Sequence, residues 1–176
     1  GACSTTVVTN TGSVAPGATN KLCAVVTPPA DAPASTTPQD VIFTVTSTNT
    51  GATDSMKDQV TVDENRSIVF TPDRTDTVVP GGTVVYSHTL TNTGNVIEGD
   101  DAGELPINVT NTLAGVTTTV YVDLDSDGIA DTNELVTGND LHSVLPNGIN
   151  PGQTYTILVK VEAPAGAQDG AQDSAV

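Results

Sequence analysis

The segment from Asp123 to Glu134, "DLDSDGIADTNE", has the acidic spacing of a calcium-binding loop. Its carboxylates recur at alternate positions, so they can point inward as the chain curls around an ion. Gly128, at the sixth position, permits the sharp turn that this pattern requires. The spacing predicts calcium ligation by Asp123, Asp125, Asp127, the Ile129 carbonyl, Asp131 and Glu134.

Five carboxylates within twelve residues repel one another unless a cation neutralises them. Calcium fits better than magnesium, which prefers fewer protein oxygens and retains its waters. The alternative is a solvated acidic turn without metal. A second acidic run, "EGDDAGE" (98–104), is interpreted as another calcium site or, more simply, as a solvated loop.

The element that must position the loop is a strand, because "VTTTVYV" precedes it. We therefore expect a structural clamp and not the helix opening of a calcium sensor. Thr and Val dominate the chain, aromatic residues make up 3%, and 16 glycines and 11 prolines interrupt the apolar runs. This composition predicts an all-β fold built from short antiparallel strands.

The charge balance excludes several functions. The formal net charge is −16, with 21 acidic residues against five Lys and Arg, so neither nucleic acid nor an anionic membrane surface is an expected partner. No apolar run is long enough to span a bilayer, so membrane insertion is not expected. The two histidines, His88 and His142, lie in no recognised catalytic motif, and we predict that the protein is not an enzyme.

The two cysteines, Cys3 and Cys23, flank two strand-like runs that meet around "NTGSVAPG". A hairpin would bring them opposite each other, which predicts a disulfide and a secreted, extracellular or cell-surface location. Such a bridge contributes roughly 3 kcal/mol in the chain-entropy model. Two unrelated buried thiols are the alternative. Asn65 and Asn108 each begin a glycan acceptor triplet.

The chain also repeats itself. "APGATNKLCAVVTPPADAPASTTPQD" (15–40) parallels "NPGQTYTILVKVEAPAGAQDGAQD" (150–173), so that Pro16 matches Pro151 and Val26 matches Val161. After the first copy the chain continues through two predicted strands around an Asn49-Thr50-Gly51 turn, and after the second copy it stops. We expect a half-module with its disulfide hairpin over residues 1–65, and a module short of its last hairpin over residues 66–176.

The pieces "PGGTVVY", "TNTGN", "DLDSDGIAD" and "PGQT…PAGA" together resemble the conserved-repeat, immunoglobulin-like domain of bacterial cell-surface and S-layer-type proteins. The resemblance covers about residues 67–176, with an echo of its second half in residues 7–62. It implies an immunoglobulin-like antiparallel β-sandwich that serves in surface display or assembly. The departure from the family pattern is the missing last hairpin.

An open sandwich edge exposes unpaired backbone groups that a neighbouring molecule can complete. We therefore expect copies of this chain to exchange strands head to tail, which gives a calcium-stabilised extracellular filament or surface layer. The alternative function is a calcium-dependent adhesive module, binding surface glycans or proteins, from a longer repeat array.

Overall fold

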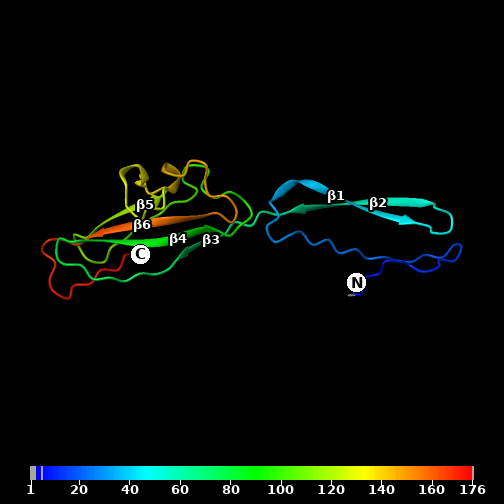
Figure 1. Ribbon diagram of the computed structural model, residues 1–176, viewed down its shortest axis with the longest axis horizontal. Coiled ribbons are helices and arrows are strands. Elements are labelled where there is room, and N and C mark those ends of the chain that lie inside the picture. Colours follow the sequence, from blue (N-terminus) through cyan, green and yellow to red (C-terminus); the bar gives the residue numbers. More distant parts are fainter. Residues whose placement is uncertain (1–2, 5, 176) are drawn as a thin grey trace. The chain divides into compact units, whose positions relative to one another are not determined.

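The computed structural model describes residues 3–4 and 6–175, and it is nearly all β (Figure 1). Its two sheets are antiparallel, which confirms the all-β prediction and is consistent with an all-β sandwich. Helical structure among these residues is confined to two single-turn 3-10 segments. The elements are β1 (Ser35–Thr46), β2 (Thr53–Val62), β3 (Ile68–Thr71), β4 (Thr83–Asn92), β5 (Thr117–Asp123), η1 (Thr132–Glu134), η2 (Leu141–Ser143) and β6 (Thr154–Glu162).

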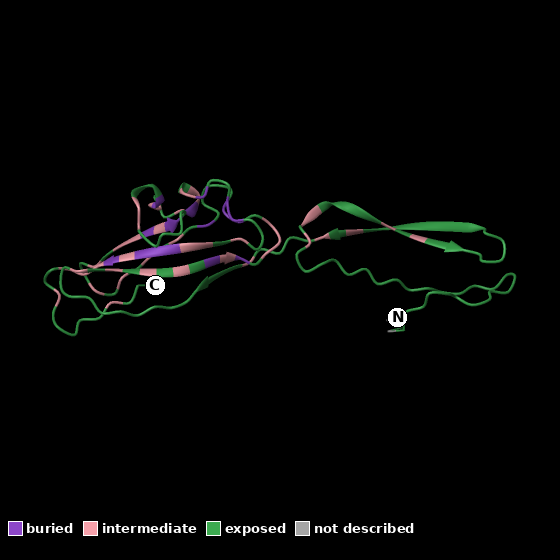
Figure 2. Ribbon diagram, in the orientation of Figure 1, coloured by how far each residue is buried: buried purple, intermediate pink, exposed green. Residues whose placement is uncertain are grey.

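The larger sheet has four strands in the order β3-β4-β6-β5. Side chains alternate along these strands, so Tyr86, Val159 and Val120, which are paired across β4, β6 and β5, share one face. Loop residues between the strands cover this face. Figure 2 shows the buried residues gathered on this sheet and the loops beside it. The buried apolar core is Leu90, Leu105, Val120, Val122, Leu141, Leu145, Ile149, Ile157, Val159 and Val161.

The smaller sheet is the hairpin β1–β2, whose strands are paired from Ser35 with Val62 to Thr46 with Thr53. The turn between them contains Gly51 at a φ of 71°, a backbone conformation that favours glycine. The two strands predicted around Asn49-Thr50-Gly51 are thus confirmed. No residue of this hairpin is buried (Figure 2). A two-stranded hairpin without a packed face is marginally stable alone.

The segment from Asp63 to Ser67, here called the linker, connects the hairpin to β3. The "TNTGN" motif (residues 91–95) forms several hydrogen bonds with it. Asn95 is central: its side chain accepts a hydrogen bond from the Asn65 N–H at 2.7 Å and donates to the Asp63 carbonyl at 3.0 Å. The Thr93 and Gly94 N–H groups both donate to the Ser67 carbonyl. A β-carbon on Gly94 would collide with the Asn65 carbonyl, so the close approach requires glycine.

Residue contacts divide the chain into two compact units, Gly1–Ala32 and Pro33–Val176. The described part of the first unit contains the Cys3–Cys23 disulfide, with a Cα–Cα distance of 5.7 Å, but it contains no β-strand. The structure therefore shows the predicted bridge without the hydrogen-bonded hairpin expected around it. The division into modules at residue 65 stays a prediction.

Candidate metal centre

Strand β5 delivers Asp123 to the start of the acidic loop, as the strand-like "VTTTVYV" predicted. Beyond the loop the chain returns to the same strand, because the Val136 N–H donates to the Val120 carbonyl at 2.9 Å. The loop is thereby fastened at both ends to β5. Gly128 has a φ of 75°, which allows the sharp turn inferred from the sequence.

Two carboxylates of this loop are buried. The side chain of Glu134 is 1% exposed, and its two oxygens accept hydrogen bonds from the backbone N–H groups of Leu124 and Asp131, at 2.7 and 3.4 Å. Asp123 is 6% exposed, and its Oδ2 accepts from the Gly128 N–H at 3.2 Å. These bonds shape the loop around its acidic side chains.

The second oxygen of Asp123, Oδ1, is buried and has no hydrogen-bond partner in the described structure. A buried carboxylate oxygen without a donor is costly, since it loses its water and gains nothing in exchange. A cation held at this position supplies the missing interaction. The residues present therefore fit a metal ion.

Side-chain oxygens of the loop approach one another in two overlapping groups, and within each group they lie no more than 4.8 Å apart. One group is Asp123, Asp125 and Glu134, and the other is Asp125, Asp127 and Asp131. The structure thus brings together all five predicted carboxylates, with Asp125 common to both groups. Either group can hold a metal ion, since carboxylate oxygens are hard ligands.

Ile129, whose carbonyl was predicted as a ligand, donates its N–H to Asp127 Oδ1 at 2.7 Å. Its side chain is 59% exposed, so this residue serves the loop through its backbone. The role predicted for its carbonyl stays a prediction.

Electrostatic crowding is visible at Asp125. The Asp127 N–H donates a hydrogen bond to its carboxylate and lowers the pKa. Desolvation and the negative charges of Asp127, Glu134 and Asp123 together outweigh that bond, so the pKa of Asp125 is raised above its ordinary value. The metal-free loop therefore favours binding of positive charge, either protons or a metal cation.

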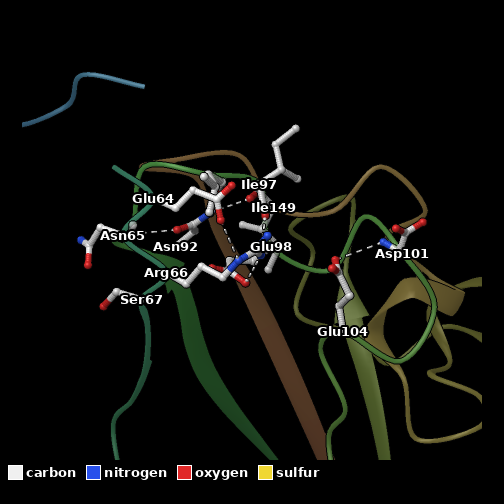
Figure 3. Close-up of polar contacts among 12 residues, drawn as sticks. Glu64, Asn65, Arg66, Ser67, Asn92, Ile97, Glu98, Asp101, Glu104 and Ile149 are labelled. Atoms are coloured by element: carbon white, nitrogen blue, oxygen red, sulfur yellow. Dashed lines mark hydrogen bonds and ion pairs between the residues drawn. The ribbon is translucent and has the colours of Figure 1, made fainter. Parts of the chain in front are cut away.

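The second acidic run has a different arrangement, which the sequence did not predict. Glu98 is only 8% exposed, and its Oε2 lies 3.3 Å from Nη1 of Arg66, whose pKa is raised chiefly by the charge of Glu98 (Figure 3). Asp100, Asp101 and Glu104 are exposed. An arginine from the linker thus supplies the countercharge here. The acidic run in the sequence does not indicate that Arg66 would pair with one of its residues.

The remaining predicted site residues lie apart from the loop. Asn65 and Asn108, the candidate glycan acceptors, are both exposed. The two histidines are each bonded to a backbone carbonyl: His88 Nδ1 lies 2.8 Å from the Pro72 oxygen, and His142 Nδ1 lies 3.2 Å from the Gly99 oxygen. That the protein is not an enzyme stays a prediction.

The Cys3–Cys23 disulfide indicates an oxidising environment such as the cell exterior. In the part of the chain that the structure describes, no helix has the length and apolarity needed to cross a bilayer. Comparison of the chain with known protein families, with curated proteins and with solved structures finds no match.

Proposed function

We propose that this protein is a structural subunit of an extracellular filament or surface layer, in which copies assemble head to tail by exchanging β-strands and calcium stabilises each subunit. The observation that carries this proposal is the amphipathic hairpin β1–β2. Its strands are paired with each other, but no residue of the hairpin is buried. Strands of this kind gain stability when another sheet covers them.

A second feature of the same chain supports an assembly. Residues 6–27 contain no strand, yet they expose several large aliphatic side chains. These are Val7, Val8, Val14, Leu22, Val25 and Val26. Exposed apolar surface of this extent is typical of an interaction site and uncommon on a protein that functions alone.

Calcium has a structural role in this proposal. The Asp123–Glu134 loop fastens the end of β5 to the segment that returns along it, and a bound cation offsets the repulsion among the five carboxylates. The resemblance of "TNTGN" and the acidic loop to conserved-repeat, immunoglobulin-like surface domains agrees with a protein built for assembly. None of these features requires a catalytic activity.

Negative-stain microscopy of the 176-residue chain, with calcium and after chelation, tests the proposal. Filaments or sheets that form with calcium and fray after chelation are the expected result. The Asp123→Asn variant should behave like the chelated protein, whereas Asp31→Asn, an exposed acid outside the loop, should assemble normally. Separate particles in every condition would overturn the proposal and favour an adhesive module.

A further inference from the structure

We propose that the free edge of β3 is the acceptor for assembly and that its occupant is the β1–β2 hairpin of a second copy of this chain. This inference rests on the proposed function and names the two surfaces that meet. It follows from the hydrogen-bond directions of β3, the two faces of the hairpin, and the linker that separates them.

Strand β3 lies at one edge of the four-stranded sheet. Its backbone directions follow from Ser67, whose carbonyl accepts from the Thr93 N–H on the β4 side at 2.8 Å. Bonded pairs alternate in an antiparallel ladder, so Val69 and Thr71 also face β4, while Ile68 and Phe70 direct their backbone groups away from it. Among the described residues, nothing is hydrogen-bonded to that outer side.

The opposite edge of the sheet is less open. There, β5 already receives the returning chain through the bridge between Tyr121 and Leu135 and the bond from Val136 to Val120. An exposed edge with unpaired groups is the usual place for an added strand. The β3 edge is therefore the better acceptor of the two.

Apolar side chains border the β3 edge on the core face of the sheet. Ile68 and Phe70 lie on the same face as Leu90 but are 43% and 47% exposed. The Phe70 ring contacts the His88 ring at a centroid distance of 5.1 Å. An incoming strand would extend the ladder and also cover this rim.

The large apolar side chains of the hairpin lie mainly on one face, here called the apolar face, which also carries Asp54 and Asp58. Phe43 lies opposite Met56, with Val41 and Val45 on the same side. On the other face, the Thr44 and Ser55 hydroxyls are bonded at 3.1 Å and Lys57 pairs with Asp40 at 3.2 Å. Alternation of this kind specifies one buried and one solvated face.

The linker keeps the hairpin from reaching β3 of its own chain. Residues 63–67 are held on the "TNTGN" motif by the bonds of Asn95 and Ser67, and Arg66 Nη1 reaches the Ile97 carbonyl and the Glu98 carboxylate (Figure 3). Pairing β2 with β3 in one chain would require this segment to form a tight turn instead. The partner is therefore another copy.

One ion pair can support the same pairing. The chain is strongly acidic, yet the exposed Arg74 is held near the β3 side of β4, where its Nε donates to the Ser87 carbonyl at 3.1 Å. The apolar face of the hairpin carries Asp58 beside Val41 and Asp54 beside Val45. Arg74 thus offers a cation at the acceptor edge that can pair with an aspartate of the donor, while Asp73 and Asp76 beside it keep this segment acidic on balance.

Cross-linking of mixed variants tests the pairing. Val69 and Thr44 are exposed and would share the outer face if the hairpin's apolar face joins the core face of the sheet. Val69→Cys protein mixed with Thr44→Cys or Ser55→Cys protein in assembly conditions should give a dimer with a short bismaleimide, which leaves the native disulfide intact. The comparison mixtures pair Val69→Cys with Val25→Cys, and Thr119→Cys on β5 with the hairpin variants.

A dimer from Val69→Cys and a hairpin variant, with none from the comparison mixtures, is the expected result. If Val69→Cys joins Val25→Cys, the donor is the N-terminal segment and the inference is wrong. If Thr119→Cys joins the hairpin, the acceptor is β5 and the inference is also wrong. In both of those cases assembly itself survives, whereas absence of any assembly contradicts the proposed function.

A matched pair of hairpin variants gives a second test. Phe43→Ser removes an aromatic side chain from the apolar face, and Ile42→Ser removes an aliphatic side chain, 66% exposed, from the opposite face. Phe43→Ser should abolish assembly and Ile42→Ser should preserve it, while circular dichroism shows the same strand content for both. Equal assembly by the two variants would overturn the assignment of the donor face.

Discussion

Residues 19–27 and strand β6 have nearly the same pattern and opposite surroundings. Both follow a Pro-Gly turn, and Leu22 and Val26 of the first segment match Ile157 and Val161 of the second. Ile157 is completely buried and Val161 is 8% exposed, because β6 lies between β4 and β5. Leu22 and Val26 are 58% and 46% exposed and belong to no strand.

The difference shows that an alternating apolar pattern does not form a strand by itself. A strand needs neighbours that accept its hydrogen bonds and cover its apolar face. Strand β6 has both within this chain. Residues 19–27 and the hairpin β1–β2 lack such cover, and in our proposal other copies of the chain supply it.

The largest expected effect is a difference in stability between alanine variants of the matching residues Ile157 and Leu22. Ile157→Ala should cost about 2–5 kcal/mol of unfolding free energy, because it leaves a cavity in the buried apolar core. Leu22→Ala should change the stability of the dilute protein by less than about 0.5 kcal/mol, since the side chain is already exposed. Urea unfolding of both variants checks this. A similar cost at Leu22 would show that residues 19–27 pack somewhere within the monomer.

Calcium should stabilise the four-stranded sheet that carries the acidic loop. At one hundred times its dissociation constant, an ion bound only to the folded state adds about 2.7 kcal/mol. We expect a higher melting temperature with calcium for the native protein. Glu134→Gln should show no such shift, because it replaces a buried carboxylate of the loop by a neutral amide. Calorimetry with calcium, and with magnesium at equal ionic strength, is the measurement. An equal shift in Glu134→Gln would place the ion elsewhere.

The linker contact can be weakened with a matched pair of glycine substitutions. Gly94→Ala should cost about 1–3 kcal/mol, because its new methyl group collides with the Asn65 carbonyl and overpacks the contact. Gly166→Ala adds the same methyl group to open space and should be nearly neutral. Urea unfolding compares them. Equal effects would mean that the contact between the "TNTGN" motif and the linker contributes little to the stability of the protein.

The smallest expected effect concerns pH in the metal-free protein. Because the pKa of Asp125 is raised on folding, the folded state holds this proton more tightly than the unfolded chain. Its contribution is therefore full at low pH and is lost as the pH rises through the raised folded value. The melting temperature of the native protein minus that of Asp125→Asn, measured with chelator between about pH 3 and pH 6, should fall as the pH rises. A slope of opposite sign would contradict the crowding described for the loop.

Local patterns predicted the parts of the structure that depend on near neighbours in sequence. The clustering of acidic side chains between Asp123 and Glu134, the strand that enters it and the turn at Gly51 each depend on a few adjacent residues. They are present as expected.

Contacts between distant residues were not predictable in this way. The buried Glu98 pairs with Arg66, which lies 32 residues earlier, and Asn95 of the "TNTGN" motif binds the linker residue Asn65, with β3 and β4 between them in the sequence. The described residues between Cys3 and Cys23 form no hairpin, for the related reason that local alternation does not supply a partner strand. Strand order and the choice of partner strand are properties of the whole folded chain.

Amide hydrogen exchange of the hairpin β1–β2 tests the central claim most directly. The calcium-loaded protein would be labelled when dilute and when concentrated enough to assemble, and residues 41–45 would be followed by mass spectrometry. We predict fast exchange in dilute protein and strong protection after assembly, because the strands gain cover and hydrogen bonds from another copy. Exchange that is equally fast at every concentration would contradict it.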